Sequence, residues 1–233
     1  MKKRDYIILG ITTIGLYALY SNIFKSKNVE LKTDDDSEKE DDNESNDKLK
    51  SLLFVGDSIS VDKSNYTYTS LVKKDLKPKG IDVDILAIGG KRKGWMLEEL
   101  PKALAKKKYS RVYIYGGTND MFSSISKETA YNNIQKMVDL VIKNGGEPYV
   151  MVGYDAKKMM TKDKLIPTKY VPTKDGMFKL AQRYFDFQDN MKNNIKNTKF
   201  VDKIDIGDNS GDGVHPNQKG HQLLKEKVIK TII

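Results

Sequence analysis

From residue 49 to the C-terminus, short apolar runs alternate with longer stretches whose apolar residues recur every three or four positions. The short runs predict buried strands, and the longer stretches predict helices with one face toward a core. Strands that alternate with helices pack as a parallel sheet covered on both faces. This pattern predicts an α/β domain over residues 49–233, with three layers in the order α/β/α.

The sequence places five strands and five main helices in this domain. The expected strands are 51–55, 81–88, 111–115, 148–153 and 199–201, and the expected helices are 66–76, 95–106, 127–143, 175–196 and 216–232. Residues 155–173 contain Pro167 and Pro172 and are expected to be irregular. A five-stranded parallel sheet between two helical layers predicts a flavodoxin-like sandwich.

Residues 6–24 contain no charged side chain and are long enough to cross a bilayer, which takes about 20 apolar residues. Basic residues at positions 2–4 favour a cytoplasmic N-terminus and an exported body. We therefore expect residues 1–28 to be a single-pass membrane anchor. One alternative is a cleaved signal peptide, although residues 18–20 (ALY) are a poor cleavage site. The other is a buried helix, which the polar residues that follow would separate from any core.

Residues 29–48 contain ten Asp and Glu against three Lys, with almost nothing apolar. Such a segment stays extended and disordered, because like charges repel and no core can form. We expect an acidic linker that holds the domain away from the membrane.

The charge of the folded body is basic. Residues 1–28 carry +4 and residues 29–48 carry −7, so +12 remains for residues 49–233 within a formal net charge of +9. The lysines of the body are spread along the chain, without a basic helix or an aromatic RNA motif. No nucleic-acid partner is therefore expected.

The chain has no Cys and only two His, at positions 215 and 221. This composition excludes disulfides, thiolate metal sites and a Cys nucleophile, and it leaves no His-rich metal centre. We expect neither a metal nor a cofactor.

Polar clusters follow several expected strands. Gly56-Asp57-Ser58 follows the first strand, Gly89-Gly90 the second, and residues 116–120 (GGTND) the third, while residues 212–216 (DGVHP) precede the last helix. Ligands of an open parallel sheet bind at the carboxyl ends of its strands. The four clusters are therefore expected to meet at one edge.

The residue types in these clusters predict nucleophilic catalysis. The hydroxyl of Ser58 needs a base, and His215 is the plausible one because the other His falls within the last helix. Asp212 precedes His215 by three residues, so one turn brings its carboxylate to the second ring nitrogen. Candidate donors to an oxyanion are the backbone N–H groups of Ser58 and Gly90 and the side-chain amide of Asn119. Two alternatives stay open at the second block: Gly89 serves in place of Gly90, or the two glycines form a plain turn.

These four blocks, in this order, resemble the SGNH (GDSL-type) hydrolase family over residues 52–233. The resemblance implies an esterase or acylhydrolase with Ser58, His215 and Asp212 as catalytic residues and Ser58, Gly90 and Asn119 as oxyanion donors. Two departures from the family pattern are Ile59, where the older family name expects Leu, and the absence of an Asn before the second block.

For several residues near these blocks the sequence allows a structural or a functional interpretation. Lys91, Arg92 and Lys93 form either a basic rim that favours anionic substrates or a solvated loop. Trp95 is either a core anchor of its helix or a platform for a sugar. Tyr154 is a candidate substrate contact beside the irregular segment. We expect Asp57 and Asp120 to support the loops, and His221 to be a surface or half-buried helix residue.

The leading hypothesis is a membrane-tethered serine esterase, outside the cytoplasm at a cell or virion surface. It would remove O-acyl groups, above all acetyl, from a surface polysaccharide through an acyl-enzyme. Two alternatives keep the fold. One is an O-acyltransferase of envelope glycans, and the other is a binding module without turnover.

Overall fold

The five strands form one parallel sheet in the order β2-β1-β3-β4-β5. They are β1 (Ser51–Gly56), β2 (Asp82–Ala87), β3 (Arg111–Ile114), β4 (Glu147–Met151) and β5 (Lys199–Val201). This arrangement comes from a computed structural model of the chain, which describes residues 49–61 and 64–233. The predicted five-stranded parallel sheet is confirmed, and its strand order is that of flavodoxin-like folds.

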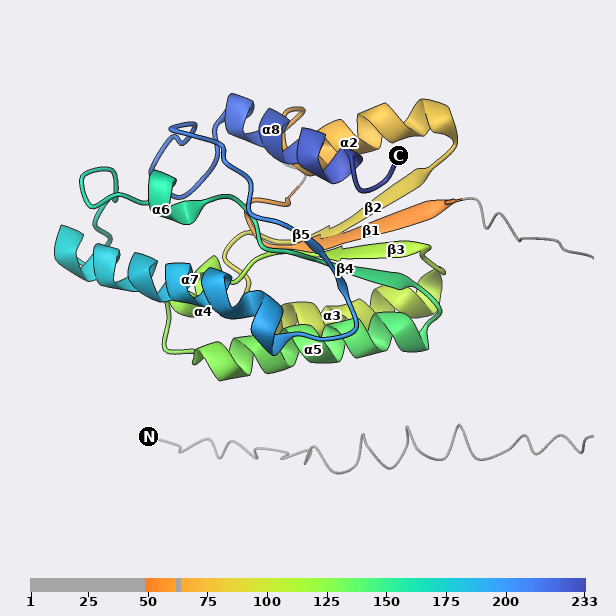
Figure 1. Cartoon of the computed structure of the whole chain (residues 1–233), viewed down its shortest axis with the longest axis horizontal. Helices are drawn as coiled ribbons and strands as arrows, with labels where there is room; N and C mark the ends of the chain where they lie inside the picture. Colours follow the sequence, from red (N-terminus) through yellow and green to blue (C-terminus); the bar gives the residue numbers. More distant parts are fainter. Residues whose placement is uncertain (1–48, 62–63) are drawn as a thin grey trace, which may run out of the picture. The chain divides into compact units, whose positions relative to one another are not determined.

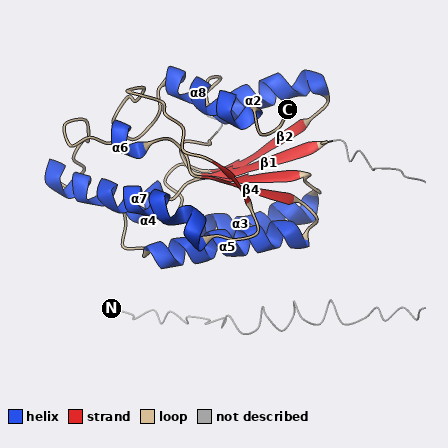
Figure 2. Cartoon of the chain, viewed as in Figure 1, coloured by secondary structure: helices blue, strands red, loops and turns tan. Residues whose placement is uncertain are grey.

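Helices cover both faces of the sheet. The pair α2 (Tyr68–Leu76) and α8 (Gln218–Ile229) packs on one face, and the pair α3 (Lys93–Lys106) and α5 (Lys127–Lys143) packs on the other. The long helix α7 (Lys174–Asn194) lies on the same side as α5 (Figure 1). Figure 2 shows the resulting three layers, with the strands between the two sets of helices.

Three short elements were not predicted from the sequence. They are α4 (Thr118–Met121), α6 (Ala156–Met159) and the 3₁₀ turn η1 (Lys77–Lys79). The structure also starts α3 at Lys93, two residues before the expected start at Trp95. Lys93 therefore belongs to the helix, and its side chain is buried.

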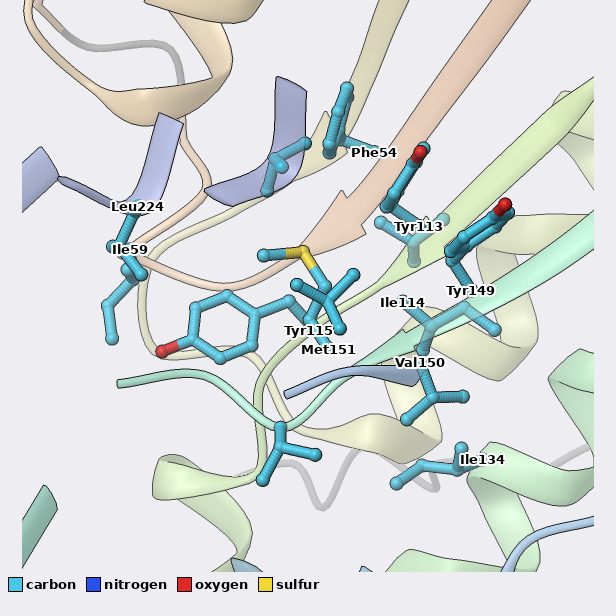
Figure 3. Close-up of a cluster of buried hydrophobic side chains, with 14 of the residues drawn as sticks. Phe54, Ile59, Tyr113, Ile114, Tyr115, Ile134, Tyr149, Val150, Met151 and Leu224 are labelled. Atoms are coloured by element: carbon cyan, nitrogen blue, oxygen red, sulfur yellow. The ribbon is translucent and has the colours of Figure 1, made fainter. Parts of the chain in front are cut away.

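Aromatic side chains tie the central strands together. Phe54, Tyr113 and Tyr149 are cross-strand neighbours on β1, β3 and β4. Adjacent rings are stacked with centroids 4.8 Å apart in both pairs (Figure 3). The Tyr113 hydroxyl lies 2.9 Å from Thr231 Oγ1, just after α8. The aromatic row therefore links the sheet to the C-terminal end of the chain.

The turn after β3 requires glycine at two consecutive positions. Gly116 and Gly117 have φ angles of +124° and +119°, which residues with a Cβ rarely adopt. A Cβ on Gly116 would lie 3.0 Å from Asp57 Oδ2, and one on Gly117 would lie 2.5 Å from the Phe187 ring. These glycines let the β3 loop approach the loop that carries Ser58.

The predicted anchor (1–28) and acidic linker (29–48) lie outside the described residues. Among the residues that the structure describes, no helix has the length and apolar character needed to cross a membrane. The expected span at residues 6–24 therefore stays a prediction from the sequence.

Candidate active site

Ser58, His215 and Asp212 form a hydrogen-bonded chain at the carboxyl edge of the sheet. The Ser58 Oγ atom lies 2.9 Å from His215 Nε2. On the other side of the ring, His215 Nδ1 lies 2.7 Å from Asp212 Oδ2. Ser58 follows β1, whereas Asp212 and His215 come from the loop before α8. The structure thus brings together the three residues that the sequence selected as catalytic.

A tight turn fixes the Asp212 carboxylate against the ring. Asp212 Oδ1 accepts the backbone N–H groups of Val214 at 2.8 Å and His215 at 2.7 Å. Ser210 Oγ accepts the N–H of Gly213 at 2.7 Å and donates to the His215 carbonyl oxygen at 3.1 Å. Sequence reasoning missed Ser210, although a serine two residues before an aspartate in a Gly-rich turn is typical of such side-chain-to-backbone bonds.

The protonation states suit a general base at His215. Burial raises the pKa of Asp212, but hydrogen bonds from the His215 ring and from two backbone N–H groups hold that pKa well below its ordinary value. The ring hydrogen bond to Asp212 in turn raises the pKa of His215, against the effect of partial burial. An ionised acceptor at Nδ1 keeps the proton there, so the neutral ring offers Nε2 to the Ser58 hydroxyl.

The catalytic side chains face solvent. The side chains of His215 and Asp212 are 48% and 42% exposed, and Ser58 is half-buried. A bulky substrate therefore reaches the hydroxyl without a large rearrangement of the described residues.

The three expected oxyanion donors follow three neighbouring strands. Ser58 follows β1, Gly90 follows β2 and Asn119 follows β3, with β1 between the other two. Gly90 is exposed with a φ of +76°, and a Cβ built there would meet nothing within 4 Å. Asn119 Nδ2 donates to the Lys91 carbonyl oxygen at 3.1 Å. Its second contact, to Asp57 Oδ2 at 3.4 Å, is long enough to be exchanged for an oxyanion.

Asp57 and Asp120 support these loops, as their positions suggested. Each is 1% exposed. Asp57 Oδ1 accepts the N–H of Ile59 at 3.2 Å, and both Asp120 oxygens accept the N–H of Lys93, at 3.2 and 3.1 Å. Burial raises the pKa of both carboxyl groups, and the nearby Lys93 ammonium opposes that rise.

The prediction of a three-residue basic rim was wrong for Lys93. Arg92 is exposed and Lys91 is half-buried, but Lys93 is only 1% exposed. Because α3 begins at Lys93, the side chain turns inward, where its charge interacts with Asp120 and Asp57. The rim therefore consists of exposed Arg92 and half-buried Lys91.

A cavity of about 420 Å³ adjoins the expected oxyanion site. Its lining residues are Gly90, Lys91, Arg92, Gly94, Trp95, Asp120, Ile125 and Asn133. The Lys91 ammonium lies 5.7 Å from the centre of the Trp95 ring, within cation–π range. Trp95 also packs against the core. The packing agrees with the predicted core anchor, and the place of Trp95 in the cavity wall leaves the sugar platform as a prediction.

The predicted substrate contact at Tyr154 was wrong. Tyr154 is fully buried, and its hydroxyl donates to the Val214 carbonyl oxygen at 2.6 Å. A parallel bridge to Ile204 holds Tyr154 inside the fold, just beyond the end of β4. This side chain therefore contacts the catalytic loop and does not reach the surface. Sequence reasoning had only its place after a strand, which does not tell which way a side chain points.

His221 is more buried than the sequence indicated. It is 5% exposed and its ring stacks on Tyr68, with centroids 6.4 Å apart and planes 13° apart. Its Nδ1 atom accepts the backbone N–H of Tyr68 at 3.3 Å. Burial, together with repulsion from His215, lowers the pKa of His221 to about 4. The ring is therefore neutral at physiological pH and belongs to the packing between α2 and α8.

A hydroxyl, an imidazole and a carboxylate in hydrogen-bonded order, beside backbone and amide donors, define a serine hydrolase. The model of the GDSL-like lipase/acylhydrolase family matches residues 54–223, which include all four polar clusters. The chain belongs to this family and is a carboxylic ester hydrolase, as the resemblance implied. No curated protein sequence matches the chain.

Several solved structures share the fold over most of the chain. A GDSL-like lipase from Bacteroides thetaiotaomicron VPI-5482 is 19% identical, with a TM-score of 0.57 over 80% of this chain and 89% of that one. The acetyl xylan esterase AlAXEase is 16% identical, with a TM-score of 0.56 over 78% and 100%. The psychrotrophic esterase EstA from Pseudoalteromonas sp. is 18% identical, with a TM-score of 0.51 over 78% and 96%. At these identities the likeness establishes the shared fold.

Proposed function

We propose that this esterase is tethered to a membrane and removes O-acyl groups, above all acetyl, from a polysaccharide outside the cytoplasm. The observation that carries the chemistry is the hydrogen-bonded series from Ser58 through His215 to Asp212. The tether and the location rest on the apolar segment 6–24 and the acidic segment 29–48 of the sequence.

The proposed reaction passes through an acyl-enzyme. Ser58 Oγ attacks the acyl carbonyl carbon while its proton moves to His215 Nε2. The tetrahedral intermediate collapses, and the departing sugar hydroxyl takes that proton. Water then attacks the acyl carbonyl and gives a proton to His215. As the bond between Ser58 Oγ and the acyl carbon breaks, His215 returns this proton to Oγ, which releases the acid and restores the Ser58 hydroxyl. Asp212 stabilises the imidazolium in both halves.

The nature of the cavity favours a short acyl group on a polar carrier. Lys91, Arg92 and Asp120 line it, beside Trp95 and Ile125. A long aliphatic chain placed there would remove the charged ends of Lys91 and Arg92 from water without giving them partners, which is unfavourable. A sugar offers hydroxyl groups to the charged residues and an apolar face to the indole. The name of the structurally similar acetyl xylan esterase agrees with such a substrate class.

The basic rim favours a carrier that bears negative charge. Lys91 and Arg92 lie at the cavity that adjoins Gly90, and residues 49–233 carry a net charge of +12. A positive surface raises the local concentration of a polyanion and speeds its association, more strongly at low salt. An acetylated polysaccharide with carboxylate or phosphate groups is therefore the preferred candidate.

The nucleophile is tested with p-nitrophenyl esters and the full-length chain. We expect hydrolysis of the acetate to be much faster than that of the laurate. Ser58→Ala should lower kcat by at least about 10³-fold, because the attacking atom is lost. Ser124→Ala, at an exposed serine, is the matched control. Equal rates for wild type and Ser58→Ala would contradict the assignment.

The acyl-enzyme and the carrier need separate measurements. A phosphonate ester, the class of inhibitor named for EstA, should add one phosphonyl group to Ser58 in intact-protein mass spectra. Labelling of another residue would refute the covalent step. Acetate release from an acetylated polyuronate should exceed release from acetylated xylan at equal acetyl content. Product that appears only when an acceptor sugar is added would indicate acyl transfer in place of hydrolysis.

The tether is tested in cells. Full-length protein should sediment with membranes, and protease added outside the cytoplasmic membrane should remove it. A variant that lacks residues 1–28 should stay in the soluble fraction and keep its esterase activity. Full-length protein in the soluble fraction would rule out the anchor.

A further inference from the structure

Lys93 is a buried ammonium group beneath the active site that no step of the proposed reaction uses. It is 1% exposed and is the first residue of α3. Among the Asp, Glu, Lys and Arg residues that the structure describes, only three are buried: Asp57, Lys93 and Asp120. The backbone N–H of Lys93 donates to both oxygens of Asp120, which holds these two residues together. The Lys93 charge also opposes the rise that burial causes in the pKa of both Asp57 and Asp120, the two carboxyl groups of this cluster.

The two carboxylates are each adjacent to a residue of the active site. Asp57 precedes Ser58, and its Oδ1 atom accepts the N–H of Ile59 on the far side of the nucleophile. Its Oδ2 atom is the long contact of the Asn119 amide. Asp120 follows Asn119 and holds the start of α3 through the N–H of Lys93. The positions of both the nucleophile and the amide donor therefore depend on these two carboxyl groups, which accept hydrogen bonds best when they are ionised.

Two buried like charges destabilise each other unless a cation lies nearby. Lys93 supplies that cation, and it leaves the cluster with one net negative charge. Without it, at least one carboxylate takes up a proton and accepts hydrogen bonds less well. We propose that Lys93 is a positioning residue of this esterase, whose charge keeps Asp57 and Asp120 ionised and thereby holds the Ser58 turn and the Asn119 amide in place.

The other titratable groups around the cluster are buried tyrosines, which burial keeps neutral, and two groups at its edges that can carry positive charge. The tyrosines are Tyr68, Tyr115, Tyr154 and Tyr184. His215 interacts with Asp57 from the catalytic loop, and Arg92 interacts with Asp120 from the residue before α3. Arg92 is exposed, so solvent weakens its effect. Lys93 is therefore the main cation for both carboxylates.

The cluster has a consequence for the pH dependence of the rate. Burial lowers the pKa of Lys93 to about 8, although Asp120 and Asp57 oppose that shift. Above this pH the ammonium loses its proton and the two carboxylates lose their cation. The rate should therefore fall on the alkaline side, whereas the loss of the proton from His215 makes the rate rise with pH.

The first test uses wild-type protein. The kcat for p-nitrophenyl acetate is measured from pH 6 to 10, with spontaneous hydrolysis subtracted. We expect an alkaline decrease centred near pH 8. A kcat that stays constant from pH 8 to 10 would overturn the proposal. Asp120→Asn should move the decrease to lower pH, because removal of that carboxylate makes it easier for Lys93 to lose its proton.

Variants of Lys93 give the second test. Lys93→Met should lower kcat by about 10- to 100-fold, less than the loss of an oxyanion donor itself, and should abolish the decrease near pH 8. Lys93→Arg keeps its charge beyond pH 10, so it should restore part of kcat without that decrease. Lys106→Met, at an exposed lysine on the same helix, is the control and should keep the wild-type profile.

The role of Lys93 rests on Ser58 as the nucleophile. Separate experiments can contradict the Lys93 role and the Ser58 assignment. A Lys93→Met protein with wild-type kcat and an unchanged alkaline decrease would refute the role of Lys93 while Ser58→Ala stays inactive. An active Ser58→Ala protein would refute the nucleophile whatever the Lys93 variants show. A Lys93→Met protein that loses thermal stability but keeps the wild-type kcat would also count against the positioning role.

Discussion

The hydroxyl of Tyr154 donates a 2.6 Å hydrogen bond to the carbonyl oxygen of Val214. Val214 is the residue before the catalytic base, and Tyr154 lies just beyond the end of β4. The bond thus connects the rigid sheet to the loop that carries Asp212 and His215. The side chains of Asp212 and His215 are partly exposed, and buried Tyr154 holds their loop from the inner side.

Tyr154→Phe removes this connection without a change in side-chain shape. Loss of a hydrogen bond to a partly buried carbonyl costs about 1 kcal/mol. We expect the free energy of unfolding to fall by that amount in urea titrations. The kcat for p-nitrophenyl acetate should fall by roughly tenfold, because the base is less well placed.

Tyr170→Phe is the matched control for this prediction. Tyr170 is 81% exposed on the segment after β4, so removal of its hydroxyl should change neither kcat nor the free energy of unfolding. A Tyr154→Phe protein with wild-type kcat and stability would show that the Val214 contact is dispensable.

The sequence predicted the sheet well because each strand is bounded by strong local signals. The first strand, SLLFV, is an unbroken apolar run that ends in Gly-Asp-Ser, and β1 is buried along its whole length. The same polar clusters that end the strands also supplied the catalytic residues. The residues that mark the ends of the strands are therefore the same residues that suggested the catalytic site.

The errors concern side-chain direction, which depends on contacts far away in the sequence. Lys93 was expected on the surface because lysine is usually exposed, but it is 1% exposed and its charge is favoured inside by Asp120 and Asp57, which are distant in the sequence. Tyr154 was expected to meet substrate, yet its partner lies 60 residues further along the chain. Neither partner can be identified from the residues next to these positions.

Asp212→Asn tests whether the carboxylate fixes the tautomer of the base. The Asn amide can present its N–H₂ group to His215 Nδ1, which leaves the proton on Nε2 and removes the acceptor for Ser58. We expect kcat to fall by about 10³–10⁴-fold with little change in the thermal midpoint. Asp208→Asn, in the same loop but exposed, should keep full activity.

The pH dependence of the same variant gives an independent check. Only neutral His215 accepts the Ser58 proton, so the wild-type rate rises with pH through the pKa of His215. That pKa lies above 6.5 because of the hydrogen bond to Asp212. Without the carboxylate, the remaining activity should begin to rise at lower pH. An acidic limb at the wild-type position would argue against Asp212 as the partner that sets this pKa.

His221 should make the fold less stable in mild acid. Its folded pKa is about 4, lowered mainly by burial, against 6.5 when the ring is free. The stability it contributes is complete above pH 6.5 and is lost as the pH falls toward 4, because only the unfolded chain takes up the proton. The free energy of unfolding falls by about 3 kcal/mol in all, and about 2 kcal/mol of this decrease occurs between pH 6.5 and 5.

Urea unfolding of wild type and His221→Gln at pH 7 and pH 5 isolates this contribution. Apart from His215, whose charge repels His221, the other titrating groups affect both proteins alike. The wild type should lose more stability than the variant between the two pH values. The same loss in both proteins would mean that His221 titrates normally in the folded state.

Gly90→Ala tests the opening beside the oxyanion site. A Cβ at this position would meet no atom of the protein, but the φ of +76° is unfavourable for alanine by about 1–2 kcal/mol. Relaxation of that strain turns the peptide and moves the N–H that is expected to meet the oxyanion. We expect kcat/KM for p-nitrophenyl acetate to fall by at least about tenfold.

Gly80→Ala is a control with nearly the same local geometry. Gly80 has a φ of +71° and equally open surroundings, but it precedes β2 whereas Gly90 follows it, so it lies at the opposite edge of the sheet. Both substitutions should lower the free energy of unfolding by a similar amount. Only Gly90→Ala should lose activity, because only its backbone N–H lies next to the cavity at the carboxyl ends of the strands. Equal kcat/KM values for the two variants would remove Gly90 from the oxyanion site and leave Ser58 and Asn119 as its donors.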